Sequence, residues 1–286
     1  MEYSALIGNP VEHSISPKLF DLLTEKLGIE YAHLKVLVKQ KEDLSSCFQA
    51  MCNLNFIGFN ITCPYKLAAY DLVDVLDPEA KKIHSINSVV INNGKTIGYN
   101  TDGNAAILAI QHFYKIGIND KVVIIGAGGV AYSILYEILK ITSNVVVFNE
   151  FIEAAEEMCN LVAPHVNYYS LYDKEKFVKE LASATVIINA TSVGMYPESD
   201  DTLINEELFK LLSTDNVCKC YFDVIFNPWH TTFIQLANKY NQLAISGGYM
   251  LIYQAILVLK LWLNVEITLS DSEIDEIANE LMKVLG

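Results

Sequence analysis

The sequence predicts an α/β protein of two domains, the first with a mixed, mostly parallel sheet and the second built around a parallel sheet. With 286 residues, the chain is long for one domain and sufficient for two. Strand and helix signals alternate through the first hundred residues, which indicates an α/β unit. A glycine-rich turn that begins at Gly126 lies between an apolar strand and a helix, and it indicates a β-α-β unit.

The first part of the chain carries the signals of the mixed sheet. Strands are expected at residues 3–7, 31–38, 58–62, 88–91 and 96–99, and helices at 17–27, 44–54 and from 66 to about 72. Ser16 is a candidate N-cap, because Pro17 would then occupy the first helical position. The turn Asn92-Asn93-Gly94 is typical of a hairpin, which makes one pair of strands antiparallel.

The second part begins with a helix over 103–114 that is expected to connect the two domains. A strand over 121–125, a helix to about 140 and a strand over 144–148 complete the β-α-β unit. Further strands are expected at 186–188 and 221–224. Helices follow from about residue 248, and by their position in the sequence they could pack on either domain.

The charge of the chain argues against two classes of partner. The formal net charge is −14 and the pI is near 4.8, so neither nucleic acid nor an anionic membrane surface would be attracted. A small anionic substrate is still compatible, because local charge governs a pocket. All 20 basic residues are lysine, so the chain has no guanidinium group with which to clamp an anion.

The cysteines give no sign of a metal site. They stand at positions 47, 52, 63, 159, 218 and 220, with no C-x-x-C pair and no zinc-like cluster with histidine. They are typical of reduced thiols in a cytoplasmic protein. The N-terminus lacks the basic region of a signal peptide, and the most apolar segment, residues 250–265, is too short to span a bilayer. That segment is expected to be a buried helix.

The glycine-rich turn is the candidate site for a dinucleotide. Gly126, Gly128 and Ala131 have the G-x-G-x-x-A spacing, in which glycines let the backbone approach a pyrophosphate at a helix N-terminus. Its β-α-β context favours a Rossmann domain, although an ordinary tight turn would have the same appearance. Glu150 follows the second strand of the unit, where its carboxylate could accept hydrogen bonds from ribose hydroxyls or simply face solvent.

Two polar motifs upstream of the turn indicate proton transfer. Asn60-Ile-Thr62-Cys-Pro-Tyr-Lys66 ends in a cation, and Asn100-Thr101-Asp102-Gly103 contains a carboxylate. A carboxylate favours the charged form of a nearby ammonium, so Lys66 is expected to donate a proton while a cofactor handles hydride. This direction favours the reduction of a ketone. Ser14 and Ser16 precede a helix, where they could bind a carboxylate or cap the helix.

Taken in order along the chain, these motifs resemble those of the shikimate dehydrogenase family, including its quinate/shikimate branch. The matching segments are Gly8-Asn9-Pro10, His13 to Pro17, Asn60 to Lys66, Ser85-Ile86-Asn87-Ser88, Asn100 to Gly103, Gly126 to Gly129, Asn189-Ala190-Thr191, Asp223 to Pro228 and Gly247 to Gln254. The resemblance covers nearly the whole chain. It implies reversible reduction of 3-dehydroshikimate to shikimate, a step toward aromatic amino acids.

The resemblance also implies a domain plan and a set of site residues. A substrate-binding catalytic domain would cover 1–103 and a Rossmann domain 104–247, with C-terminal helices at 248–286 that pack back on the first domain. Lys66 would transfer the proton, with Asp102 as its partner. Substrate binding falls to Ser14, Ser16, Thr62, Asn87, Phe226 and Gln254, and cofactor binding to Gly126, Ala127, Gly128, Gly129, Val130, Asn149, Glu150, Thr191, Gly247 and Met250.

Two positions depart from the family pattern. Phe226 stands where the family usually has a tyrosine whose hydroxyl helps to hold the substrate, and loss of that bond would cost about 1 kcal/mol. Glu150 stands where NADP-dependent members have arginine, and its charge would repel a 2′-phosphate. We therefore expect NAD(H), although NADP(H) is commoner in the family. The alternatives are a quinate/shikimate dehydrogenase that uses NAD and a catalytically silent metabolite-binding regulator of the same fold. A monomer and a homodimer are both compatible with the sequence.

Overall fold

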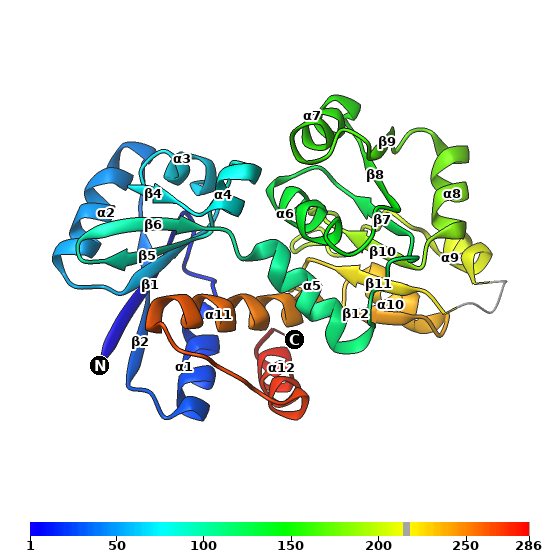
Figure 1. The fold of residues 1–286 in the computed structure, drawn as a ribbon. Helices are drawn as coiled ribbons and strands as arrows, with labels where there is room; N and C mark the ends of the chain where they lie inside the picture. The colour runs from blue at the N-terminus through cyan, green and yellow to red at the C-terminus, as the bar shows by residue number, and fades with distance from the viewer. Residues whose placement is uncertain (214–217, 286) are drawn as a thin grey trace. The chain divides into compact units, whose positions relative to one another are not determined.

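Residues 1–213 and 218–285 are described in the computed structural model, and the chain divides into two compact units. The first unit comprises Met1–Thr101 and Gln254–Ile277, and the second comprises Asp102–Tyr253 and Ala278–Gly286. Both are built from a sheet and helices, so the predicted fold class is confirmed (Figure 1). The domain plan expected from the resemblance, with boundaries after 103 and 247, stays a prediction; the compact units divide after residues 101 and 253.

The first unit contains a six-stranded sheet with parallel and antiparallel neighbours. Its strands are β1 (Glu2–Gly8), β2 (Tyr31–Leu37), β3 (Gly58–Ile61), β4 (Val75–Leu76), β5 (Ser88–Asn92) and β6 (Lys95–Tyr99), in the order β2-β1-β3-β5-β6-β4. β1 runs parallel to β2 and β3, whereas β5 is antiparallel to β3 and β6. The expected hairpin joins β5 to β6, and its turn residues Asn93 and Gly94 have φ of 51° and 75°.

Helices cover both faces of this sheet. One face packs its apolar side chains, among them Ile7, Phe59 and Ile61, against Phe48 of α2 (Leu44–Asn53) and the segment that leads into α3 (Lys66–Tyr70). Trp262 of α11 (Gly247–Leu263) lies on the sheet, since its indole N–H donates to the carbonyl of Val89 at 2.9 Å. The remaining helices are α1 (Ser16–Leu27), the short η1 (Lys41–Asp43) and α4 (Pro78–Ile83).

The second unit contains a six-stranded sheet that is parallel throughout. Its strands are β7 (Val122–Ile125), β8 (Val145–Asn149), β9 (Asn167–Ser170), β10 (Val186–Asn189), β11 (Cys220–Asp223) and β12 (Leu243–Ile245), in the order β12-β11-β10-β7-β8-β9. The chain builds the sheet outward from β7 to β9 and then returns to β10, so the strand order reverses between β7 and β10. In doubly wound sheets, ligands bind beyond the carboxyl ends of the strands at such a point.

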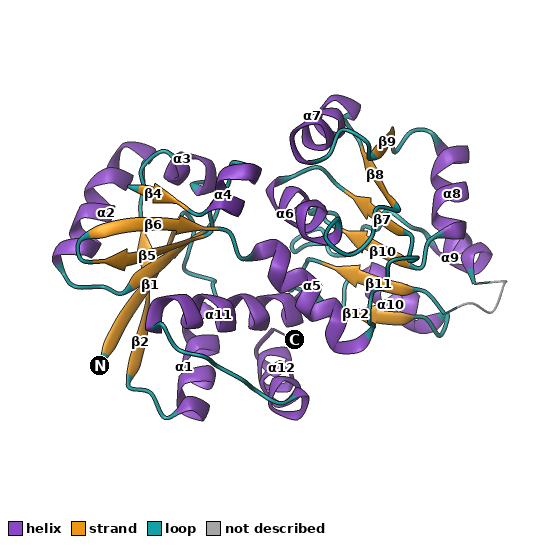
Figure 2. Ribbon diagram, in the orientation of Figure 1, coloured by secondary structure: helices purple, strands orange, loops and turns teal. Residues whose placement is uncertain are grey.

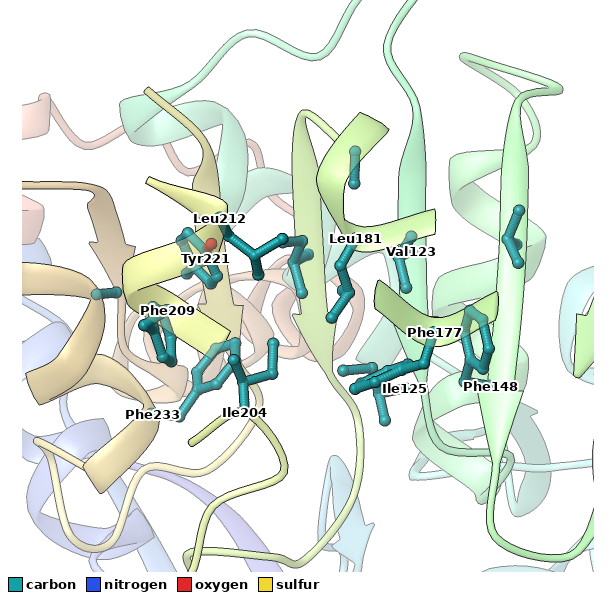
Figure 3. Packing of buried hydrophobic residues seen from close by; sticks show 14 of the residues in the cluster. Val123, Ile125, Phe148, Phe177, Leu181, Ile204, Phe209, Leu212, Tyr221 and Phe233 are labelled. Atoms are coloured by element: carbon teal, nitrogen blue, oxygen red, sulfur yellow. The ribbon is translucent and has the colours of Figure 1, made fainter. Parts of the chain in front are cut away.

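Helices and strands alternate around this sheet (Figure 2). The helices are α5 (Asp102–Phe113), α6 (Gly129–Ile138), α7 (Ile152–Val162), α8 (Lys174–Ser183), α9 (Glu206–Leu212) and α10 (Thr232–Lys239). The last helix, α12 (Asp271–Leu285), is divided between the two units after Ile277. Figure 3 shows the core on one face, where Phe148 and Tyr221 of the sheet pack with Phe177 of α8, Phe209 of α9 and Phe233 of α10. This buried core holds the strand ends in fixed register.

The start of α1 differs from the expectation that Ser16 caps this helix. Ser16 is not the N-cap of α1, because Ile15 holds that position, and the side chain of Ile15 makes no capping hydrogen bond. A Ser16 cap would accept the N–H of Leu19 through its side chain, but that N–H donates to the carbonyl of Ile15 instead. The prediction that Ser16 caps the helix was therefore wrong.

Among the described residues, no helix combines the length and hydropathy needed to cross a membrane.

Candidate functional site

The polar motifs of the first unit meet where β1 and β3 end. These two strands are parallel neighbours, so their carboxyl ends lie at the same edge of the sheet. The N–H of Asn9 donates to the carbonyl of Cys63 at 3.1 Å, and the N–H of Thr62 donates to the carbonyl of Ile7 at 2.9 Å. A Cβ at Gly8 would lie 2.3 Å from Cγ2 of Thr62, so glycine is what lets the two loops approach. The loop that leads to Ser14 and the loop that leads to Lys66 are therefore adjacent.

Ser14 and Ser16 form a small hydroxyl cluster at the start of α1. The hydroxyl of Ser14 donates to that of Ser16 at 3.1 Å, and the N–H of Ser16 donates to Ser14 Oγ at 3.2 Å. Both side chains are partly exposed. The pair can offer hydroxyl donors beside a helix N-terminus, which suits a carboxylate.

Lys66 is the first residue of α3, and its place is set by the preceding tyrosine. Tyr65 is buried, and its hydroxyl donates to the carbonyl of Val38 at 2.7 Å. The N–H of Tyr65 donates to the carbonyl of Thr62 at 3.0 Å, which turns the chain into the helix. Lys66 and Thr62 are both half-buried. A lysine in this position has an anchored backbone and a side chain that remains accessible.

Asn87 is locked to the residue before Asp102. Its side-chain amide donates to Thr101 Oγ1 at 3.0 Å, and its amide oxygen accepts the N–H of Thr101 at 3.0 Å. Asn60 donates to the carbonyl of Asn87 at 3.3 Å, so the first motif also supports this site. Asn87 and Asp102 are 1% and 2% exposed, and such buried polar groups are costly unless they are held in hydrogen bonds. Thr101 was not predicted as a functional residue, although its motif was.

Lys66 belongs to the first unit and Asp102 to the second, so their pairing stays a prediction. The substrate-binding role of Gln254 also stays a prediction. Gln254 is half-buried and lies in the part of α11 that is assigned to the first unit. Met250 and Gly247 lie buried in the part assigned to the second unit.

The glycine-rich turn of the second unit has the shape that a pyrophosphate requires. Gly126 follows β7 with φ of 117°, and a Cβ there would lie 2.7 Å from the carbonyl oxygen of Ala190. Apart from nearby residues of the same turn and helix, no atom of the described residues lies within 4 Å of a Cβ built at Gly128 or Gly129, so the space beside these glycines is open. Side chains at these two positions would fill that space. α6 begins at Gly129, and its N-terminus favours negative charge, so the residues present fit a dinucleotide.

The end of β8 carries the two residues expected near the adenosine ribose. Asn149 is the last residue of β8, and its amide donates to the carbonyl of Phe151 at 2.9 Å. Glu150 is exposed and accepts a hydrogen bond from the hydroxyl of Tyr172 at 2.7 Å. β9 is the parallel neighbour of β8, with Asn149 opposite Ser170, which explains why Tyr172 reaches Glu150. Tyr172 had no role in the sequence-based prediction.

Thr191 and Phe226 lie on the loops that follow β10 and β11. Thr191 donates through its hydroxyl to Asn189 Oδ1 at 2.7 Å, and Phe226 is 36% exposed. The two strands are parallel neighbours, so both loops emerge at the same edge as the glycine-rich turn after β7. Ala127 and Val130 belong to that turn and to the first turn of α6. Within the described part of the chain, no group of three or more histidine, cysteine or acidic side chains is placed to hold a metal ion.

Comparison with known proteins gives a consistent set of relatives. Residues 6–89 match the family described as the shikimate dehydrogenase substrate binding domain. A protein of Methanocaldococcus jannaschii described as shikimate dehydrogenase (NADP+) is 36% identical over 267 residues, which make up 91% of this chain and 91% of the relative.

Solved structures agree with this match. A crystal structure of a shikimate dehydrogenase in complex with NADP+ has a TM-score of 0.86 and 30% identity, and the alignment covers 100% of this chain and 96% of that one. A shikimate 5-dehydrogenase of Listeria monocytogenes in complex with shikimate and NAD has a TM-score of 0.85 and 26% identity, with 98% and 96% covered. The similarity thus extends over both units of the chain.

Proposed function

Because the chain belongs to the shikimate dehydrogenase family, we propose that it catalyses the reversible reduction of 3-dehydroshikimate to shikimate with a nicotinamide cofactor. In the family, this reaction is a step toward the aromatic amino acids. The observation that carries the proposal is the meeting of two motifs at one sheet edge, where the loops that lead to Ser14 and Lys66 are joined by the bond from Asn9 to Cys63. Hydroxyl donors and a cation are thereby available to one small polar substrate.

Each polar group of the first unit has a proposed task toward the substrate. Ser14 and Ser16 would bind the carboxylate, since they present hydroxyls at the N-terminus of the 12-residue helix α1 in a chain without arginine. Thr62, Asn87 and Gln254 would hold ring hydroxyls. Phe226 would supply apolar contact only, because it lacks the hydroxyl that the family usually has there.

Lys66 would donate a proton to the carbonyl oxygen in the reductive direction and accept it back in the oxidative direction. Its ammonium carries the charge needed to stabilise the oxygen as negative charge develops on it. The network of Asn87 and Thr101 holds the backbone that precedes Asp102, the proposed partner of Lys66. A bound nicotinamide cofactor would supply the hydride chemistry, while these side chains bind the substrate and handle the proton.

For the cofactor, we propose NAD(H) in preference to NADP(H). The support is local charge: Glu150 at the end of β8 is held by Tyr172, and the sequence has no lysine between Lys140 and Lys174. A 2′-phosphate would face a carboxylate there, whereas a free 2′-hydroxyl could donate to it. The relative from Methanocaldococcus jannaschii is described as NADP+-dependent and the Listeria structure holds NAD, so members of the family differ in this respect.

The function is tested by following the formation of reduced nicotinamide with the purified protein. Shikimate and quinate are each supplied as substrate, with NAD+ and NADP+ in turn. We expect turnover of shikimate with at least one cofactor, and a kcat/KM for quinate below that for shikimate. Cofactor binding by calorimetry without turnover of either substrate would instead indicate a regulator that has kept the fold.

A further inference from the structure

Asp223 is a fully buried carboxylate of the second unit, and both of its oxygens accept hydrogen bonds. It is the last residue of β11, directly opposite Asn189 at the end of β10, and its exposed fraction is 0%. Its Oδ1 accepts the side-chain amide of Asn189 at 3.1 Å and the N–H of Ile225 at 3.0 Å. Its Oδ2 accepts the hydroxyl of Thr231 at 2.7 Å. The donors come from two segments of the chain, the end of β10 and the loop that follows β11.

An ionised carboxylate can only accept hydrogen bonds, and this property sets the orientation of Asn189. The NH2 of Asn189 must face Asp223, so its amide oxygen must face the following loop. There it accepts both the N–H and the hydroxyl of Thr191, at 3.1 Å and 2.7 Å. The NH2 also donates to the carbonyl of Val193 at 3.2 Å, and Thr191 Oγ1 accepts the N–H of Val193 at 3.1 Å. A chain of hydrogen bonds that starts at Asp223 and passes through Asn189 and Thr191 thus holds the loop of residues 190–194 in place.

The same carboxylate orders the loop of residues 224–231, which carries Phe226. Its bonds to Ile225 and Thr231 fix the two ends of this loop, and Thr231 in turn caps α10 by accepting the N–H of Ile234. The start of α11 rests on this loop: the N–H of Gly247 donates to the carbonyl of Ile225 at 3.1 Å. A Cβ at Gly247 would lie 2.3 Å from the carbonyl oxygen of Val224, so little movement is possible there.

Stability alone is a poor explanation for a carboxylate in this place. Its hydrogen-bond partners are all neutral, and burial raises the pKa of Asp223 to about 6 in spite of them. Burial of a charge without a cation is costly, so a neutral side chain would suit a purely structural role better. Costly groups of this kind concentrate at functional sites, where geometry matters more than stability.

We propose that Asp223 is a positioning residue, which orders the loops 190–194 and 224–231 and the start of α11 so that Thr191, Phe226 and Gly247 are in place before the ligands bind. This inference rests on the proposed function, since it assumes that these residues face the cofactor and the substrate. Preformed loops spare the ligands the entropic cost of ordering them. Asp223 itself touches neither ligand in this account, so its loss should weaken binding more than it slows the chemical step.

The test compares four variants of the full-length protein. Asp223→Ala removes the acceptor, Asp223→Asn keeps the shape and part of the hydrogen bonding, and Thr231→Val removes one donor. Thr142→Ala is the matched control: Thr142 is 1% exposed and donates to the carbonyls of Ile118 and Asp120, before β7 and β8 begin. For each variant, the Kd for NAD+ and for NADP+ is measured by calorimetry, together with kcat, the KM for shikimate and the thermal midpoint.

We expect Asp223→Ala to raise the Kd of the preferred cofactor by roughly ten-fold or more and to raise the KM for shikimate, with a smaller change in kcat. Asp223→Asn should lie between wild type and Asp223→Ala. Thr142→Ala should lower the thermal midpoint while its Kd stays within about two-fold of wild type. If Asp223→Ala does not fold, Asp223→Asn and Thr231→Val take its place, each with a raised Kd expected.

The inference is overturned if the Asp223 and Thr231 variants that fold lower the midpoint as Thr142→Ala does but leave Kd and KM within about two-fold of wild type. Its failure can be told apart from failure of the proposed function. Wild-type protein that binds a nicotinamide cofactor but does not turn over shikimate contradicts the function, whereas the Kd series still decides the role of Asp223.

Discussion

The hydroxyl of Ser14 donates to Ser16 Oγ at 3.1 Å while the N–H of Ser16 donates to Ser14 Oγ at 3.2 Å, so the two serines hold one another at the start of α1. Ser16 caps no N–H of the helix, whereas Ser14 Oγ accepts the N–H of Ser16, the first helical residue. The oxygen of Ser14 can keep this bond while the hydroxyl hydrogens turn toward an anionic ligand.

The serines are tested by Ser14→Ala and Ser16→Ala. Each should raise the KM for shikimate by roughly ten-fold, since a hydrogen bond to a charged group contributes about 1.5–3 kcal/mol. Ser16→Ala should leave the thermal midpoint nearly unchanged, because Ser16 caps no N–H, whereas Ser14→Ala should lower it slightly, because the N–H of Ser16 loses its acceptor. Ser46→Ala, at an exposed serine of α2, is the control. Unchanged binding of shikimate by calorimetry in Ser14→Ala would move the carboxylate site elsewhere.

The cofactor preference is tested at Glu150. Wild-type protein should show a higher kcat/KM with NAD+ than with NADP+, because the carboxylate repels a 2′-phosphate and accepts a hydrogen bond from a 2′-hydroxyl. Glu150→Arg should shift the ratio toward NADP+ by at least ten-fold, on the order of the effect expected for one charge-assisted bond. Glu153→Arg, which places the same charge in the first turn of α7, is the control.

Two results would count against this reading of the cofactor site. A wild-type preference for NADP+ would refute the proposed specificity. An equal response to Glu150→Arg and Glu153→Arg would show that the general charge of this region, and not Glu150 itself, makes the distinction.

A buried histidine predicts how the stability of the first unit depends on pH. Ser4 Oγ accepts the hydroxyl of Tyr31 and shares a hydrogen bond with His33 Nδ1 at 2.6 Å, and the imidazole of His33 stacks on Phe20 with ring centroids 4.1 Å apart. Burial lowers the pKa of His33 from an ordinary value of 6.5 to about 3. Between these values the unfolded chain binds a proton that the folded chain does not. The contribution of His33 is thus fully present above pH 6.5 and is lost as the pH falls toward 3.

Urea unfolding at a series of pH values measures this contribution. Wild-type protein should lose about 2–3 kcal/mol through His33 between pH 6.5 and 4.5, in addition to the losses shared with other groups. His33→Phe should be less stable at pH 7, because Ser4 loses its hydrogen bond to the imidazole, but its stability should fall less steeply over this range. His165→Gln, at an exposed histidine, should keep the slope of wild type. Equal slopes in wild type and His33→Phe would contradict the assignment.

The sequence predicts the architecture well because its signals are local. The glycine-rich turn and the hairpin at Asn93 and Gly94 depend on backbone conformations that few residues adopt, and both are confirmed. The prediction of a Ser16 cap is wrong because the helix begins one residue earlier than such a cap requires: Ile15 takes the cap position, and its carbonyl accepts the N–H of Leu19. Local patterns do not settle at which of two neighbouring residues a helix begins.

The supporting residues of the site could not be found in the same way. Thr101 and Asp223 act through hydrogen bonds to Asn87 and Asn189, which are 14 and 34 residues away in the sequence. These pairs follow from strand order and register, which local sequence patterns do not reveal. The residues proposed to touch ligands, by contrast, stand in short motifs with a recognisable order along the chain.

In the proposed reaction Lys66 supplies the proton, and this role is tested by the kcat for shikimate of Lys66→Met, measured beside wild type. Methionine keeps the length of the side chain and removes the proton donor. We predict active wild-type protein and a kcat lower by about 10²–10⁴-fold in the variant, with cofactor Kd nearly unchanged. A Lys66→Met protein whose kcat is within a few-fold of wild type would contradict the account.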